Sequence, residues 1–488
     1  MHPAPADDRA DVAFEGQIGD LGAVPREEGE PVLRLGRSVR FLVVAYVAAA
    51  VVLLLALAPP RVASAAAGDV GYEDFSFNGT SEPTGTKRAE SVLWFNDGSW
   101  WGSMWDTATS DFHIFKFSVA TQSWSVTPTT LDPRANSHAD VLWDGSHLYV
   151  ASHLAVADGL SAVQGYPSYL YRYSYNASTK TYSADAGFPV QINDYKTETL
   201  VIDKDSTGKL WATWQQNNQI FMNRTLNGND QTWGTPFQLP ATATDVTVDD
   251  NSAVIAFNGD KIGVMYSNQS SANDAMWFAV HQDGQPDTTW EAARTAIQGS
   301  NTADDHINLK ALVTDSNGRV YAAVKTSFTS SAQPLIMLLV RDVFSGSWAN
   351  YPIARVSDCP NRPLVLIDTT NRVLHAFYSA PGPTAFDCNS SGGEIQEKTS
   401  SLDSISFPVG AGTPVIVDYD SPYVHNSSST KQNVNSQTGI LVIARNSHTT
   451  NYWHHFETLT GGPPPTPTPT PPAATPTPTP TPPVSTPT

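Results

Sequence analysis

Cysteine and basic residues are scarce in this chain of 488 residues. The sequence has two cysteines, too few for a disulfide-rich scaffold or a cysteine-based zinc cluster. It has 28 Lys and Arg against 47 Asp and Glu, which gives a formal net charge of −19. A surface this acidic repels phosphate backbones, so we expect no nucleic-acid partner.

Charged residues of either sign are also few, at 15% of the chain. Hydrophobic residues make up 40% and aromatic residues 10%, enough to fill a large core and to exclude a wholly disordered chain. Thr, Ser, Asn, Gly and Pro replace the missing charges. This composition is typical of strands and turns in an extracellular protein.

The N-terminal part contains an apolar run, residues 41–58, that follows Arg34, Arg37 and Arg40. These arginines predict that residues 1–40 lie in the cytoplasm and that the run inserts into the membrane. Two interpretations stay open: a signal peptide cleaved near Ala65 or Ala67, and an uncleaved anchor. In both, residues 68–460 form an extracellular domain, secreted or membrane-anchored.

The C-terminal part, residues 461–488, is rich in Pro and Thr. Residues 463–488 contain 13 Pro and 9 Thr. Such a segment cannot bury a core, and it favours an extended polyproline-II conformation that acts as a spacer.

One pattern recurs seven times between these two segments: an apolar stretch, a turn containing Asp, Asn or Gly, and a second apolar stretch. The copies lie at 92–105, 141–153, 200–214, 253–267, 311–325, 365–379 and 433–445. Asn and Gly tolerate the positive φ that tight hairpin turns require. The flanks are rich in β-branched and aromatic residues, which favour strands.

The spacing of the copies, roughly 40–60 residues, predicts one four-stranded sheet per copy. We therefore predict an all-β fold, a single β-propeller at residues 68–460, with seven blades favoured over six or eight. The seventh copy has one strand too few. The stretch 69–78 at the N-terminus is predicted to supply this strand and to close the circle, which removes two exposed sheet edges.

Three turns carry a family resemblance: LNGNDQTW (226–233), QDGQPDTTW (282–290) and DVFSGSW (342–348). They resemble degenerate copies of the S-x-D-x-G-x-T-W box of sialidases and other BNR-repeat propellers. The resemblance implies the propeller fold over residues 87–460. Sialidases also use three arginines to bind a carboxylate. Only Arg88 and Arg362 stand at the start of predicted innermost strands, and no third arginine completes that set.

Ligands of propellers usually bind at the face where the innermost strands begin, and the loops between second and third strands share that face. Reading these positions gives a polar circle with aromatic members, which suits sugars because rings stack on aromatic faces and polar groups fix hydroxyls. The predicted ligand-binding residues are Arg88, Glu90, Trp105, His153, Tyr195, Lys196, Lys310, Arg362, Tyr378 and Lys431.

The same face holds candidate catalytic groups. Glycoside hydrolysis uses two carboxyl groups, and elimination from a uronate polymer uses a base and a cation near the acid group. The predicted catalytic residues are Asp140, His138, Glu198, Asp305 and His306.

The two cysteines, Cys359 and Cys388, flank the sixth copy on the same face, and we predict that they form a disulfide. No cofactor is expected. The alternating carboxylates Asp203 and Asp205 ahead of Gly208 suggest either a structural calcium turn or a plain Asx turn.

Two functions remain open from the sequence. The first is an extracellular carbohydrate-recognising propeller, which is a polysaccharide hydrolase or lyase if the candidate catalytic groups converge. The second is a non-catalytic surface module for adhesion or for binding cell-surface proteins, held on a Pro/Thr stalk. We expect a monomer in either case.

Overall fold

The computed structural model describes residues 61–62, 69–312, 318–382, 388 and 392–461. The predicted membrane-entry run at 41–58, both cleavage positions and the Pro/Thr segment from residue 462 lie outside these ranges. Within the described residues, no helix is long and apolar enough to cross a membrane.

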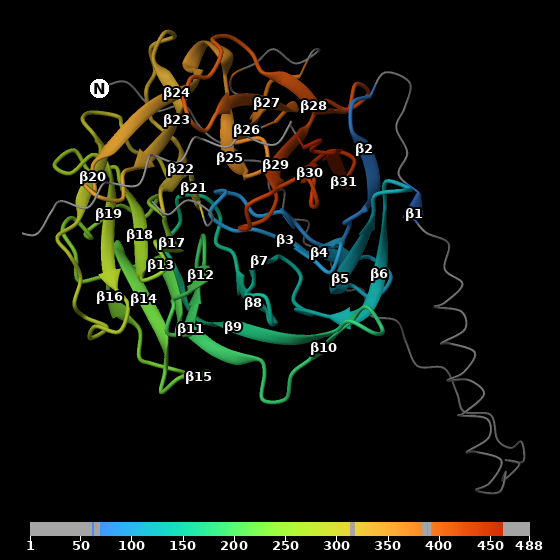
Figure 1. Cartoon of the computed structure of the whole chain (residues 1–488), viewed down its shortest axis with the longest axis horizontal. Coiled ribbons are helices and arrows are strands. Elements are labelled where there is room, and N and C mark those ends of the chain that lie inside the picture. Colours follow the sequence, from blue (N-terminus) through green and yellow to red (C-terminus); the bar gives the residue numbers. More distant parts are fainter. Residues whose placement is uncertain (1–60, 63–68, 313–317, 383–387, 389–391, 462–488) are drawn as a thin grey trace, which may run out of the picture.

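The described chain is all-β and forms seven sheets arranged in a circle, as Figure 1 shows. The prediction of a seven-bladed propeller is confirmed. The one helical element among the described residues is the 3-10 helix η1 (Val356–Asp358).

Blades 1 to 4 follow the chain. Blade 1 contains β3 (Leu93–Asn96), β4 (Ser99–Asp106), β5 (Asp111–Ser118) and β6 (Ser123–Thr130), joined at the outer edge by β1 (Arg61–Val62). Blade 2 contains β7 (Ser137–Trp143), β8 (His147–Leu154), β9 (Val163–Asn176) and β10 (Thr181–Ala184), with β11 (Val190–Lys196) also paired to β9. Blade 3 contains β12 (Val201–Lys204), β13 (Leu210–Gln216), β14 (Gln219–Leu226), β15 (Asn229–Trp233) and β16 (Phe237–Gln238). Blade 4 contains β17 (Ser252–Phe257), β18 (Lys261–Asn268), β19 (Ala275–Gln282) and β20 (Arg294–Gln298).

Blades 5 to 7 complete the circle. Blade 5 contains β21 (Ile307–Ala311), β22 (Val320–Lys325), β23 (Pro334–Arg341) and β24 (Trp348–Arg355). Blade 6 contains β25 (Asn361–Asp368), β26 (Val373–Ala380), β27 (Glu394–Ser401) and β28 (Thr413–Val417). Blade 7 contains β29 (Val424–Ser428), β30 (Ile440–Asn446), β31 (Asn451–Glu457) and β2 (Tyr72–Ser76).

In blades 1 to 6 each repeated hairpin forms the inner part of one blade, as the sequence predicts. In blade 7 the innermost strand is β29, which lies ahead of the copy at 433–445, and that copy contributes only β30. In blade 1 the turn between β3 and β4 contains Gly98 at φ +70°, and in blade 4 Gly259 lies at φ +73° between β17 and β18. These positive φ values explain why Gly recurs there, because other residues are strained in that region.

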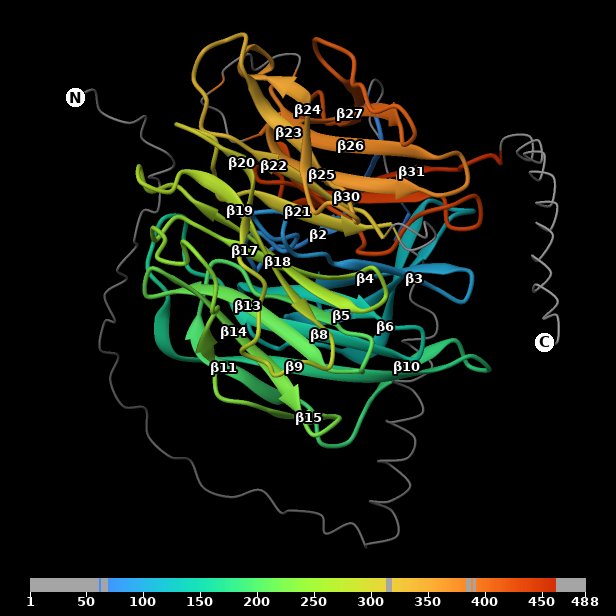
Figure 2. The same ribbon diagram turned by 60° about the vertical axis from the view of Figure 1, so that its left-hand side comes forward.

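The N-terminal strand closes the propeller. Tyr72 of β2 pairs with His454 of β31 in an antiparallel register, so the last blade takes its outer strand from the start of the domain. Leu93 N donates to Ser429 O at 3.0 Å, which joins the first innermost strand to the last. Figure 2 shows β2 beside β31 from a second direction. The prediction for residues 69–78 is confirmed.

Apolar side chains fill the spaces between neighbouring blades. Trp94, Trp101 and Trp124 of blade 1 are at most 1% exposed, and they pack with Tyr182 and Trp453 of the blades on either side. The packed blades hold the starts of their innermost strands at fixed positions around the axis. The face where these strands begin is called the mouth below.

Candidate functional site

Residues 82–91, which lead into β3, form an entrance segment that crosses the mouth. Thr84 Oγ1 donates to Asn426 O of blade 7 at 2.6 Å, and Asn308 Nδ2 of blade 5 donates to the carbonyl of Arg88 at 2.7 Å. Because the segment is tied to blades 5 and 7 and leads into blade 1, its side chains are directed to several blades at once. Lys87, Arg88 and Glu90 are all buried there.

Arg88, Arg362 and Arg445 form an arginine cluster at the mouth, contributed by blades 1, 6 and 7. Arg445 Nη2 lies 2.6 Å from Glu82 Oε1. Arg88 donates to the carbonyls of Ser427 and Gly85. Burial by itself would raise the pKa of Glu82, but Arg445 and the other two arginines lower it below its usual range. The cluster therefore stabilises an ionised carboxylate.

Burial and the neighbouring Arg362 lower the pKa of Arg88 to about 9, so its guanidinium still carries a charge at neutral pH. The third arginine of the cluster is Arg445. It lies near the end of β30, not at the start of an innermost strand, and its pairing with His425 of β29 brings it to the mouth.

The backbone around this cluster is strained. Arg88, Arg362 and Asn426 have φ values of 67°, 56° and 55°, and Glu82 has φ 52°. Residues other than Gly avoid this region unless the surrounding structure holds them there, and such strain is concentrated at functional sites.

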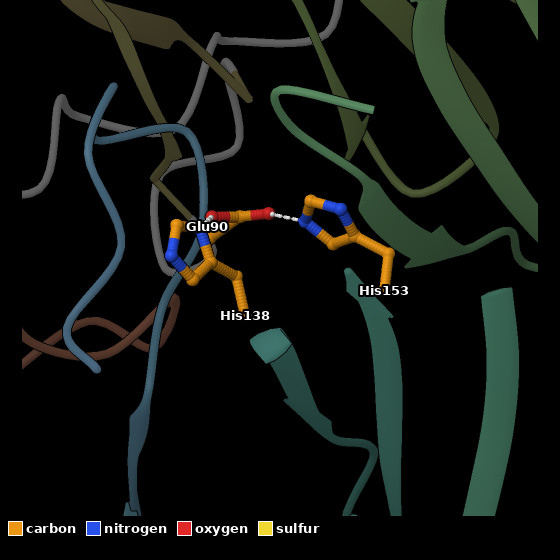
Figure 3. Close-up of side chains that lie close together, drawn as sticks. All are labelled: Glu90, His138 and His153. Carbon is orange, nitrogen blue, oxygen red and sulfur yellow. Dashed lines mark hydrogen bonds and ion pairs between the residues drawn. The ribbon is translucent and has the colours of Figure 1, made fainter. Parts of the chain in front are cut away.

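Glu90 lies between two histidines of blade 2, as Figure 3 shows. Its Oε1 is 2.6 Å from His153 Nε2, and its Oε2 is 3.9 Å from His138 Nδ1. Leu200 N also donates to Oε1 at 3.1 Å. All three side chains are buried.

His138 is held in its neutral form. Burial lowers its pKa below the usual value, against the opposite effect of Glu90. Among the described residues, Nδ1 of His138 has no hydrogen-bond partner. A neutral imidazole with an unoccupied nitrogen, beside a carboxylate that can stabilise its charged form, has the properties of a general base.

A second charged group surrounds Lys87. Its ammonium contacts Asp158 and Asp305 and lies 3.3 Å from Glu198 Oε1. Burial raises the pKa of Glu198 well above its usual range, and the carboxylates of Asp305 and Asp158 add to this effect. Burial and Asp305 likewise raise the pKa of Asp249 to about 7. Lys87, Asp158, Glu198, Asp249 and Asp305 are called the Lys87 cluster below.

His306 lies beside the Lys87 cluster. Its Nδ1 is 2.7 Å from Asp304 Oδ1 and 2.6 Å from Asp305 Oδ1, and Lys325 Nζ is 2.9 Å from Asp304 Oδ2. The Nδ1 of His306 is therefore held by two carboxylates, one of which Lys325 also contacts, while its Nε2 has no hydrogen-bond partner among the described residues.

Some predicted residues lie away from these groups. Asp140 and Lys431 form an ion pair at 2.7 Å farther along the axial channel. Lys310 is buried beside them, and burial together with the charge of Lys431 lowers its pKa to about 7. Trp105 and Tyr378 are buried in the interblade core, so their ring faces are not available at the mouth. Tyr195 and Lys196 lie in β11 at the rim, where Lys196 Nζ is 5.6 Å from the Tyr166 ring.

Several residues of the mouth are missing from the prediction. Glu82 and Asp158 come from loops whose positions no local pattern reveals. His425, buried between the arginines with a strongly lowered pKa, belongs to β29 itself. An unusual density of charge in residues 82–90 was the signal available in the sequence.

The mouth contains three groups of possible metal ligands: Glu90 with His138 and His153; Asp304, Asp305 and His306; and the carboxylates around Lys87. The predicted calcium turn has a different environment. Asp205 accepts bonds from Thr207 N, Lys209 N and Trp211 Nε1, while Asp203 accepts from Ala256 N. These bonds are those of an Asx-type turn, and calcium there stays an untested prediction.

The predicted disulfide is confirmed: Cys359 and Cys388 are bonded. The bond ties the segment between η1 and β25 to the loop between β26 and β27.

The fold and site define a seven-bladed propeller with a buried, charged mouth. The sequence matches no protein-family model and no curated protein. Among solved structures, polysaccharide lyase Uly1 is 9% identical with a TM-score of 0.41, covering 76% of this chain and 90% of that one. The alpha-L-arabinanase of Penicillium chrysogenum is 12% identical with a TM-score of 0.41, covering 69% and 98%. The NanB sialidase of Streptococcus pneumoniae is 10% identical with a TM-score of 0.38, covering 64% and 68%. All three act on carbohydrates by name, but TM-scores this low carry no argument about the activity of this chain.

Proposed function

We propose that this protein is an extracellular propeller that binds a carboxylated sugar of a polysaccharide at its mouth and cleaves the chain by elimination. The observation that carries the proposal is the arginine cluster, which contacts the carboxylate of Glu82 through Arg445 and holds it ionised, beside the neutral imidazole of His138. The extracellular location rests on the sequence and agrees with the disulfide.

Glu82 shows what the arginine cluster can hold. Guanidinium groups bind carboxylates through paired, charge-assisted hydrogen bonds. The Glu82 side chain is 31% exposed and lies in a loop, so it can move aside. A uronate carboxylate that takes its place meets the same three cations. Bound there, the sugar presents the carbon next to its carboxylate to the histidines.

The elimination then needs one base and charge stabilisation. His138 removes the proton from the carbon next to the carboxylate, and the arginine cluster stabilises the negative charge that develops on the acid group. The electron pair forms a carbon–carbon double bond as the bond to the leaving glycosidic oxygen breaks. The imidazolium returns its proton to that oxygen, so atoms and charge balance. Glu90 stabilises the imidazolium and His153 orients Glu90.

A second function, binding without turnover, is favoured by one observation. The entrance segment fills the mouth, and Arg88 and His138 are each 3% exposed. A mouth that stays closed leaves only the rim for a partner, such as a cell-surface protein.

The test is to incubate the full chain with pectate, alginate and hyaluronan and to record the ultraviolet absorbance of the unsaturated acid. We expect turnover on one of these polymers, and a loss of about 10²- to 10⁴-fold in kcat for His138→Gln, because a general base contributes about that much. Arg362→Lys should mainly raise KM. The matched control is Arg372→Lys, an arginine paired with Asp403 on the hairpin-turn side, which should leave turnover unchanged.

The pH profile gives an independent readout. Because burial lowers the pKa of His138, its base form persists to more acidic pH, and the acid limb of kcat/KM should lie below 6.5. New reducing ends without ultraviolet absorbance indicate hydrolysis and overturn elimination. Binding of a polymer without either product supports the non-catalytic function. No binding to any acidic polymer overturns the proposal as a whole.

A further inference from the structure

A group of histidines and glutamates lies between blades 6 and 7, in elements the proposed function does not use. It contains His375 of β26, Glu397 of β27, and His455 and Glu457 of β31. His375 Nδ1 is 2.6 Å from Glu397 Oε1. Ligand atoms of His375, Glu397 and Glu457 all lie within 4.8 Å of one another. These four residues are called the interblade cluster.

Strand register explains why these side chains meet. His375 pairs with Thr399 and Phe377 pairs with Glu397, so His375 and Glu397 are diagonal neighbours on one face of blade 6. His455 and Glu457 are two residues apart in β31 and share the face of blade 7 that lies toward Glu397, whose charge acts on His455. The packing of blade 6 against blade 7 therefore brings the four side chains together.

The cluster is poorly satisfied by the protein itself. Among the described residues, the Glu457 carboxylate makes no hydrogen bond or ion pair, and the Nε2 of His375 is buried without a partner. His375 is 5% exposed. Two carboxylates held close together repel each other, and a cation bound between them would offset this repulsion.

We propose that the interblade cluster binds one zinc ion, with His375, Glu397 and Glu457 as ligands and His455 or water in the fourth position. Imidazole nitrogen and carboxylate oxygen are ligands that zinc takes readily. Tetrahedral zinc with bonds of about 2.0–2.2 Å places its ligand atoms about 3.4 Å apart, so small side-chain rotations close the present spacing.

A zinc ion at this position has a structural role. It links β26 and β27 of blade 6 to β31 of blade 7, the strand to which the N-terminal β2 pairs. Because folding brings the ligands together, binding the ion stabilises the closed propeller.

The experiment uses the full chain stripped with EDTA, then equilibrated with ZnCl2 and desalted. Elemental mass spectrometry should find one zinc per chain, and Tm should rise on zinc addition and fall again with EDTA. Glu457→Gln and His375→Gln should each lose the bound zinc and the zinc-dependent rise in Tm. Glu457 lies at the end of its strand and is half-buried, so Glu457→Gln keeps the test usable if His375→Gln fails to fold.

The matched control is His281→Gln. His281 of β19 is also buried, and its Nε2 also lacks a partner among the described residues, but it packs against Trp211 and Trp290 instead of carboxylates. The His281→Gln variant should bind zinc as the unaltered chain does. His153→Gln removes one of the possible metal ligands at the mouth, so it distinguishes zinc bound at the mouth from zinc bound at the interblade cluster. Zinc lost from His153→Gln but kept by Glu457→Gln, or no zinc bound at all, overturns the proposal. The first result would place the ion beside His138 and so also bear on elimination, whereas the second leaves elimination at the mouth untouched.

Discussion

Lys87 shows how one residue organises half of the mouth. Its side chain is 8% exposed, and its ammonium contacts carboxylates from three blades. Burial by itself would lower the pKa of Lys87, but Asp305, Glu198 and Asp158 raise it well above the usual value, so the side chain stays charged. The carboxylates in turn depend on this charge, because buried anions without a counter-ion are costly.

Lys87→Met is therefore expected to lower the free energy of unfolding by about 3–5 kcal/mol, since it removes one partner of a buried ion-pair network. Urea denaturation followed by tryptophan fluorescence measures the change. The control is Lys180→Met, which removes a lysine that is 49% exposed and paired with Asp97 at the surface. It should leave the denaturation midpoint unchanged. Equal effects of the two substitutions would contradict the structural role of Lys87.

At the scale of elements, the blades depend on close packing between a strand and its neighbour. Gly263 of β18 has no Cβ to accommodate, and the Phe278 ring of β19 lies over it. Phe278 in turn packs against Phe257 and Trp348. The glycine is thus required by space and not by backbone conformation, unlike the hairpin glycines.

Gly263→Ala should lower the free energy of unfolding by about 1–3 kcal/mol, because an added Cβ overlaps the Phe278 ring and overpacks the core. Thermal or urea denaturation measures it. Gly461→Ala serves as control, since its Cβ would make only an ordinary contact of 3.9 Å with Thr370. If Gly263→Ala left the free energy of unfolding unchanged, the core of blade 4 would be able to accommodate a Cβ at this position, contrary to the structure.

At the scale of the whole molecule, closure of the circle joins the two ends of the domain. Phe77, next to β2, is 2% exposed and packs edge-to-face on Tyr452 of β31. Asp74 of β2 lies 2.8 Å from His454. Residues near the N-terminus therefore contribute to the core of the last blade.

Phe77→Ala should cost about 3–5 kcal/mol of unfolding free energy, because it leaves a cavity at the closure. Calorimetry of the full chain measures it as a lower Tm. The comparison is Phe344→Ala, whose ring is 83% exposed. That substitution should change stability by less than about 0.5 kcal/mol. If the two behaved alike, β2 would not be a stabilising part of the propeller.

The sequence was sufficient for the fold because local patterns define it. Seven apolar hairpins with turn residues at regular spacing specify strands, and a missing strand in the last copy specifies its replacement by β2. The positions of His138, His153 and Glu90 before or within inner strands also followed from strand direction. Tyr378 and Trp105 were expected on the same grounds, yet both are buried between blades, because alternate residues of a strand face opposite sides and a loop boundary shifted by one residue reverses the side.

By itself the sequence determined the class of fold, the closing strand and the disulfide, since each depends on periodicity, turn chemistry or spacing along the chain. It favoured seven blades over six or eight, and the tertiary structure decided for seven. Tertiary structure alone decided which charges meet. The arginine cluster joins residues 88, 362 and 445, and the interblade cluster joins residues 375, 397 and 457. Electrostatic interactions act through distances in space, and these distances are set only when the blades pack around the axis.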